Sequence, residues 1–303
     1  MARKVIDTTT NNGTYIGDPA KVAFDKVNDN FAELYGFGQA DGSNLLINPE
    51  LRINQRVFAG GALAANTYGY DRWRAGSSAC NVTANNGVIT HASGPLVQVL
   101  ENPGLASTQV TLSVLSPSAA LNVSIGGVTA TIAAGTGRRS ATVTLPSGAT
   151  GNVIVQITAT SASYRQLKLE VGAAATPFSA RPWATELVMC QRYYEKSYNL
   201  SAKPGTAGAG DGRSTTLATG LPTAAHSWGQ AVAFKVAKRA NPAVTVYSHA
   251  TGAVGYARDS TINGDVPAVV SAPGESGFLW YASAAGSPSS VNLECQWTAD
   301  SEL

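Results

Sequence analysis

Charged side chains are scarce in this sequence of 303 residues. Lys, Arg, Asp and Glu make up 13% of it, whereas they make up about 25% of an ordinary soluble domain. The formal net charge of +2 is too small for a nucleic-acid-binding protein, which needs a concentrated basic face. The basic clusters, Arg138-Arg139 and Lys235 with Lys238-Arg239, are short and are interpreted as solvated loops or strand ends. We therefore expect no nucleic acid among the partners.

Cysteine and histidine are also rare, with three of each. The cysteines are odd in number and far apart, which predicts buried free thiols rather than a disulfide framework or a metal site: Cys80, Cys190 and Cys295. The histidines lack the HxH or HxxxH spacing of metal ligands: His91, His226 and His249. No metal and no cofactor are expected.

Long apolar runs are missing. No window approaches the roughly 18 apolar residues of a membrane span, and the residues after Met1 do not form a signal peptide. We therefore expect a chain made in a reducing cytoplasm, without membrane insertion.

Patterns typical of enzymes are missing as well. Glycan-cleaving enzymes direct two carboxylates at one bond, and the sequence pairs none of the candidates Asp71, Glu101 and Glu170. No Gly-x-Ser-x-Gly elbow lies between a strand and a helix, although a Ser/His/Asp triad is geometric and stays open at this stage. The glycine-rich stretch 205–212 lacks the Lys-Ser/Thr of a phosphate loop. The sequence predicts a protein that is not an enzyme.

Short strands, by contrast, are frequent, and glycine is plentiful at 31 residues. Leu121–Ile125 and Val128–Ile132 alternate apolar and polar residues around Gly126-Gly127, which predicts a hairpin. Strands spaced by about 8–12 residues and divided by Gly, Pro, Asn and Ser are typical of a β-sandwich or jelly roll. We predict a jelly-roll β-sandwich over residues 41–182. Its other strands are expected at 44–47, 96–100, 110–115, 142–145, 153–157 and 167–171.

An N-terminal segment, residues 1–40, is predicted to contain one helix. Asp18-Pro19 is a start signal, with an N-cap residue before a proline at the first helical position. Gly36 and Gly38 end the helix. A helix of about 17 residues is unstable alone, so its apolar stripe must pack on other chains, which we favour, or on its own body. The stripe has heptad-like spacing: Ala20, Phe24, Val27, Phe31 and Leu34.

The remaining residues, 183–303, predict a C-terminal antiparallel β-domain. Residues 185–195 predict one or two helical turns or a long strand, and residues 202–212 a mobile loop. The prolines in Pro177-Phe178 and Pro182-Trp183 predict an extended linker between the two β-domains. Strands are expected at 229–236, 243–247, 253–257, 277–282 and 291–297.

Two groups of aromatic and polar residues are candidates for glycan binding. Sugars stack on aromatic rings while neighbouring polar side chains bind the hydroxyls. One group lies in the sandwich: Tyr70, Arg72 and Trp73. The other lies in the C-terminal domain: Tyr247, Tyr256, Arg258, Asp259 and Trp280. The alternative is that these rings fill cores or line interfaces between chains.

Several stretches, in this order, resemble structural proteins of tailed bacteriophages. Residues 17–19 with 23–35 resemble the N-terminal module by which fibres and spikes are held on the virion. Residues 44–49 with 70–73 resemble the opening of a phage jelly-roll module, and residues 167–178 resemble its closing strand. Glu186-Leu187 with residues 190–194 resembles the junction that follows this module, and residues 297–303 resemble fibre tips.

This resemblance implies a homotrimeric virion fibre. Its N-terminus would bind other virion proteins of the tail, neck or capsid, and its C-terminal part would recognise polysaccharide on the host cell surface as a receptor-binding protein. Linking several weak sites can raise avidity by about 10²–10⁴. Alternatives are a head fibre, decoration or collar protein without a receptor role, and a surface-glycan depolymerase or esterase.

Overall fold

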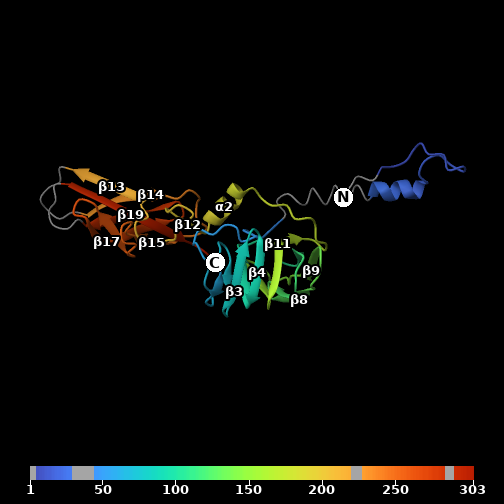
Figure 1. Ribbon diagram of the computed structural model, residues 1–303, viewed down its shortest axis with the longest axis horizontal. Coiled ribbons are helices and arrows are strands. Elements are labelled where there is room, and N and C mark those ends of the chain that lie inside the picture. Colours follow the sequence, from blue (N-terminus) through green and yellow to red (C-terminus); the bar gives the residue numbers. More distant parts are fainter. Residues whose placement is uncertain (1–4, 29–43, 220–226, 284–289) are drawn as a thin grey trace.

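The structure is a computed structural model that describes residues 5–28, 44–219, 227–283 and 290–303. Within these ranges the chain is mainly β, with three antiparallel sheets (Figure 1). Two sheets form a sandwich between residues 61 and 171, and the third lies between residues 194 and 300. Helix α2 (Trp183–Gln191) connects the two parts. The predicted fold class is confirmed.

The sandwich has one sheet of six strands and one of five. In spatial order, the first contains β1 (Gly61–Leu63), β3 (Cys80–Asn85), β4 (Val88–Ser93), β11 (Ala162–Val171), β6 (Gln109–Leu115) and β9 (Arg138–Thr144). The second contains β2 (Arg74–Ala75), β5 (Pro95–Leu100), β10 (Val153–Thr158), β7 (Leu121–Ile125) and β8 (Val128–Ile132).

Alternation of apolar residues builds the core between these two sheets. Along β10, Val153, Val155 and Ile157 are buried while Ile154 faces outward, as expected when successive side chains point to opposite faces. The predicted hairpin is also present, since Ile125 pairs with Val128 around two glycines with positive φ.

The apolar run 44–47, predicted to be a strand, is not one. Its backbone is bound largely by side chains instead, because the Gln98 amide both donates to the Ile47 carbonyl (2.7 Å) and accepts from the Ile47 amide (2.8 Å). Asn44 Oδ1 in turn accepts from the amide of Leu46. The segment therefore packs against strand β5 of the sandwich without being part of a sheet.

The third sheet curls into a half-barrel around β19 (Ser290–Asp300). This strand pairs with four others: β12 (Tyr194–Lys196), β13 (Ser214–Thr219), β15 (Ala243–Tyr247) and β16 (Tyr256–Asp259). The sheet continues from β16 through β17 (Gly264–Gly274) and β18 (Gly277–Ser283) to β14 (Ser227–Ala233). It then meets β13, because Thr216 Oγ1 donates to the Gly229 carbonyl at 3.0 Å.

Residues 185–212 contain a helix, a short strand and a loop. The stretch 185–195 contains the helical alternative, since α2 extends from Trp183 to Gln191, and in place of the long strand only the three-residue strand β12 begins at Tyr194. The predicted loop 202–212 contains no helix or strand, and Gln296 Nε2 donates to the carbonyls of Ala209 (2.7 Å) and Asp211 (2.8 Å) within it. Side chains of the half-barrel therefore hold this loop.

Residues 5–28 fold into a small hook that ends in a helix, which begins at Ala20. Asp18 was expected to cap this helix, but its carboxylate instead accepts from the Asp7 amide (2.8 Å) and from Lys26 Nζ (2.6 Å). The predicted stripe is exposed at Ala20 and Phe24 and half-buried at Val27. Phe31 and Leu34 lie outside the described residues.

Candidate functional site

The sandwich group predicted for glycan contact lies inside the protein. Trp73 is fully buried, and its indole Nε1 donates to the Asn48 carbonyl at 2.8 Å. Tyr70 is also buried, and its hydroxyl accepts from the Ala84 amide at 2.9 Å. Core packing, the alternative that the sequence left open, describes both rings, because a sugar cannot stack on a ring that is already covered.

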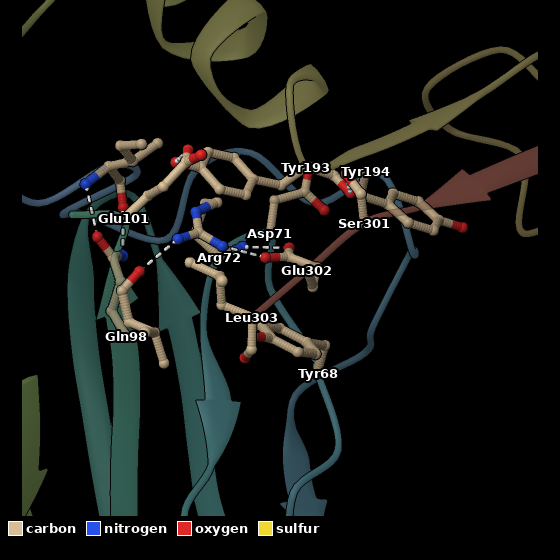
Figure 2. Close-up of polar contacts among 12 residues, drawn as sticks. Tyr68, Asp71, Arg72, Gln98, Glu101, Tyr193, Tyr194, Ser301, Glu302 and Leu303 are labelled. Carbon is tan, nitrogen blue, oxygen red and sulfur yellow. Dashed lines mark hydrogen bonds and ion pairs between the residues drawn. The ribbon is translucent and has the colours of Figure 1, made fainter. Parts of the chain in front are cut away.

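Arg72, the third member of this group, joins the sandwich to the half-barrel. Its guanidinium is buried, forms an ion pair with Glu302 and donates to the Val99 carbonyl at 2.6 Å (Figure 2). It also lies 3.5 Å from the centre of the Tyr193 ring, a distance suited to a cation–π contact. The arginine is therefore an interdomain anchor.

A second arginine repeats this arrangement beside the first. Arg56 lies over the Tyr194 ring at 3.7 Å and pairs with Asp71 at 3.3 Å and with Asp300 at 3.0 Å. Burial raises the pKa of Asp71 to about 6, although Arg56 opposes this effect. Asp71 is thus a structural carboxylate of the junction.

The other two carboxylates considered for catalysis are partnered separately. Glu101 accepts from Arg192 at 2.9 Å and from the Tyr193 hydroxyl at 2.9 Å. Glu170 pairs with Lys168 at 3.0 Å. Each of the three carboxylates therefore has a basic partner of its own. Across the described residues, no group of three or more His, Cys, Asp or Glu is placed to hold a metal ion.

Two members of the half-barrel group point inward. Trp280 is buried and donates through Nε1 to Ser214 Oγ at 2.9 Å. Asp259 is buried as well, and its Oδ1 accepts from the Thr261 amide. Neither side chain is accessible to a glycan.

The rest of this group is more accessible. Tyr256 is exposed and Arg258 is half-buried, and as alternate residues of β16 they share one face. Arg258 pairs with Asp265. Tyr247 is half-buried and packs edge-on against Tyr198. Tyr256 and Arg258 are the members that stay available for a ligand.

A hollow of about 490 Å³ opens on the sandwich, and Tyr70 is the one predicted glycan-contact residue among those that line it. It lies between the loop 50–54 and the turn 85–87, which joins β3 to β4. Its walls carry a carboxylate, a guanidinium and three amides, with the buried Tyr70 as part of the floor: Glu50, Arg52, Asn54, Asn85 and Asn86. These groups are donors and acceptors suited to hydroxyl groups.

The two chain segments that form this hollow are set by local backbone chemistry. Asn86-Gly87 has positive φ at both residues, the geometry of a type I′ hairpin turn. A β-carbon at Gly87 would lie 2.9 Å from Glu50 Oε1, so glycine there lets the carboxylate approach the turn. Glu50 and Arg52 pair at 3.1 Å, and burial raises the pKa of Glu50.

Asn48 fixes the loop that carries Glu50 and Arg52. Its Nδ2 donates to the carbonyls of Ile53 (2.8 Å) and Asp71 (2.9 Å), and its Oδ1 accepts from the Ile53 amide (2.9 Å). The Asn48 amide donates to Glu186 of α2. The loop and the helix are therefore held together as one unit.

Through this contact, α2 places an exposed aromatic ring beside the hollow. Trp183, the first residue of the helix, is 51% exposed. It lines a shallow groove of about 60 Å³ together with Phe178, and this groove shares Glu50 and Arg52 with the larger hollow. We call the hollow and this extension, with Trp183 at its edge, the Trp183 groove.

The charges in the Trp183 groove balance. Glu50 pairs with Arg52, and Glu186 pairs with Arg181 at 3.2 Å. A groove with two ion pairs, several amides and an exposed indole suits a neutral polar ligand that has one apolar face. It is less suited to a phosphate, which requires excess positive charge.

Sequence reasoning missed this site because its parts lie far apart in the chain. Trp183 was read only as part of a linker. The Asn86-Gly87 turn was detectable, since Asn-Gly between alternating residues is a strong hairpin pattern. The strands on either side of it contain many Thr, Asn and Ser residues and were not predicted.

Within the part of the chain that the structure describes, no helix is long and apolar enough to cross a membrane.

No family model matches the chain, and no curated protein matches it.

Solved structures give distant likenesses. A structure titled as a CBM4 module is 16% identical, with a TM-score of 0.26, over 40% of this chain and 99% of that one. Discoidin II of Dictyostelium discoideum is 9% identical, with a TM-score of 0.23, over 83% of this chain and 94% of that one. The PBSX exported protein XepA is 10% identical, with a TM-score of 0.17, over 80% of this chain and 84% of that one. Similarity this distant carries no argument about the function of this chain.

Proposed function

We propose that this chain is a non-enzymatic glycan-binding protein that attaches a virion to polysaccharide on its host cell. The observation that carries the glycan part is the exposed Trp183 ring at the edge of a groove with balanced charges. The virion part is supported by the sequence resemblance to phage fibres.

The chemistry of the Trp183 groove matches a sugar ring. The apolar face of a pyranose can stack on the indole, which supplies contact area at low entropic cost. Hydroxyl groups at the ring edge can then bind the Glu50 carboxylate, the Arg52 guanidinium and the asparagine amides. Glu50 is buried and is paired with Arg52, so little order is lost on binding.

The N-terminal hook is proposed to hold the chain on the particle. Phe24 and Ile16 are 68% and 66% exposed, and large apolar side chains this exposed favour a protein partner. That partner would be a virion protein of the tail, neck or capsid, with sister chains alongside. The fibre would be made in the host cytoplasm and assembled into the virion.

A glycan array tests the binding proposal. Purified chain, detected through a C-terminal label, should bind a subset of neutral or mixed bacterial surface oligosaccharides. Trp183→Ala should lose that binding while keeping the circular dichroism spectrum of the parent. An array on which the parent binds nothing, or on which both proteins bind equally, would contradict the proposal.

Particle assembly tests the virion part separately. A chain without residues 1–40 should keep its array profile but fail to join particles in an infected host. Incorporation of the shortened chain at the parental level would contradict attachment through the hook. That result would favour the alternative function of a decoration or collar protein that binds the particle through another surface.

A further inference from the structure

The chain enters the sandwich through residues 44–48, which are not a strand but are hydrogen-bonded at every position. Asn44, the first of them, is buried. Its side chain bonds to β11 through both of its polar atoms, since Nδ2 donates to the Leu167 carbonyl at 2.9 Å and Oδ1 accepts from the Leu169 amide at 3.1 Å. The Leu45 amide donates to the Leu169 carbonyl at 2.8 Å. We call residues 44–48 the entry segment.

The linker that leaves the sandwich also holds the entry segment. Arg181, two residues before the start of α2, donates to the carbonyls of Asn44 and Leu46, to the latter at 3.0 Å. Its guanidinium also pairs with Glu186 of α2 at 3.2 Å. Hydrogen bonds from a charged donor are stronger than those between neutral groups. Arg181 therefore ties the point where the chain enters the sandwich to the helix that carries Trp183.

The contacts of the entry segment are spread over both sheets of the sandwich. Strand β11, which lies between β4 and β6 in the six-stranded sheet, binds Asn44 and Leu45. Ile47 exchanges two hydrogen bonds with Gln98 of β5 in the five-stranded sheet. Leu46 is fully buried in the core. A pull on the chain from its N-terminal side is therefore resisted first at Asn44, and directly behind it by a buried side chain and by the second sheet.

The Trp183 groove begins where the entry segment ends. Glu50 and Arg52, which line the groove, come just after Asn48 in the chain, and the Asn48 amide donates to Glu186 of α2. The half-barrel comes only after α2, because its first strand, β12, begins at Tyr194. The half-barrel therefore lies outside the path along which a pull passes from the N-terminal side to the groove.

We infer that the entry segment, held by Asn44 and Arg181, is a mechanical anchor that passes a pull on the N-terminal part of the chain to the Trp183 groove without stretching the half-barrel. Forced unfolding is governed by the rate at which the folded state breaks, so the contacts that break first set how long it survives a given force. In this chain those contacts are the hydrogen bonds of Asn44 and Arg181. The use of the anchor on a particle tethered through glycan rests on the proposed function, whereas the anchor itself requires neither glycan nor virion.

Force spectroscopy on single molecules tests the anchor without glycan or particle. One handle is attached at the N-terminus and the other at Ala184→Cys, an exposed position beside Trp183 on α2. The three native cysteines are buried, so the added cysteine reacts selectively. Asn44→Ala removes both side-chain bonds to β11 and should shorten the lifetime of the folded state at constant force by about tenfold. Arg181→Gln should shorten it to a similar extent.

Asn54→Ala is the matched control, because the Asn54 side chain also bonds one carbonyl and one amide, both of Phe58, but comes after the entry segment in the chain. It should change the lifetime by less than about twofold. Equal lifetimes for Asn44→Ala and Asn54→Ala, or an unchanged lifetime for Asn44→Ala, would overturn the inference.

The parent chain gives a second test that does not depend on the variants folding. Its entry segment should leave the sandwich in the same step in which the sandwich opens. A separate earlier step with the length of residues 44–48 would overturn the inference. Both readouts are the same whether or not the chain binds a glycan, so failure of the anchor and failure of the proposed function are distinguishable.

Discussion

Replacing Glu302 with alanine should destabilise the junction of the two β-domains more than any change of an exposed ion pair. In the parent, the buried Arg72 guanidinium has Glu302 as its ion-pair partner and the Val99 carbonyl as a further acceptor. Among the residues that the structure describes, its Nε has no hydrogen-bond partner. Removal of the carboxylate therefore leaves a buried cation with one acceptor and the Tyr193 ring.

The expected loss follows from the cost of leaving one charge of a buried pair uncompensated, about 3–5 kcal/mol. Glu302 also accepts from the Arg72 amide at 3.1 Å, which favours the upper part of this range. A chain of this size loses about 2–4 °C of melting temperature per kcal/mol. Glu302→Ala should thus lower the melting temperature by roughly 10 °C.

Differential scanning calorimetry at neutral pH measures the change in melting temperature and also shows whether the two β-domains unfold together. The parent should unfold in one transition, because the junction couples both domains, and Glu302→Ala should separate the transition into two. Arg192→Gln is the control at the same junction, since the side chains of its pair with Glu101 are 42% and 27% exposed and the pair should contribute about 1 kcal/mol.

A double variant completes the test. Arg72→Met with Glu302→Leu removes both charges, and it should recover more than half of the stability that Glu302→Ala loses. A loss below about 1 kcal/mol for Glu302→Ala, or no recovery in the double variant, would refute the role assigned to the buried pair.

Three further predictions concern other parts of the fold. Gly94→Ala should cost more than about 2 kcal/mol in urea unfolding, because φ is +83° and the new β-carbon would lie 2.0 Å from the Ala79 carbonyl oxygen. Equal stability would show that this turn can move. Asp71→Asn should remove a pH dependence. Since burial raises the pKa of Asp71 to about 6, the folded state holds a proton that the unfolded state has released above about pH 4. This contribution to stability is therefore present at pH 4 and lost as pH rises through 6, by up to about 3 kcal/mol. Urea unfolding at pH 4 and above pH 6 should show a smaller difference in the free energy of unfolding for Asp71→Asn than for the parent. Lys238→Met should cost about 3–5 kcal/mol, because Glu195, paired with Lys238 at 2.7 Å, is fully buried. Chemical denaturation with an unchanged midpoint would contradict this.

The sequence was informative wherever an apolar pattern coincides with a strand. The hairpin of Leu121–Ile125 and Val128–Ile132 alternates strictly, and its glycines require the positive φ that they have. Strands built largely from Thr, Ser and Asn were missed. Residues 214–219 form β13 because β19 supplies their hydrogen-bonding partners. The local sequence contains no pattern that predicts this pairing.

The candidate residues show the limit of local reasoning about a site. An aromatic ring next to an arginine looks the same in a sequence whether it binds a sugar or fills a core. Arg72 is buried by Glu302, which lies 230 positions away, and Trp73 is fixed by the backbone of Asn48. Trp183, in contrast, stays exposed because α2 is anchored through polar residues, with Glu186 and Gln191 buried.

Isothermal titration of a glycan selected on the array, into the parent chain, Trp183→Ala and Tyr256→Ala, tests the central proposal most directly. The two variants are matched, since each removes one exposed aromatic ring, Trp183 from helix α2 and Tyr256 from strand β16 of the half-barrel. Our account predicts that Trp183→Ala weakens binding by about 2 kcal/mol, or roughly 30-fold, while Tyr256→Ala leaves the affinity unchanged. Loss of affinity in Tyr256→Ala alone would place the site on the half-barrel and contradict the assignment to the Trp183 groove.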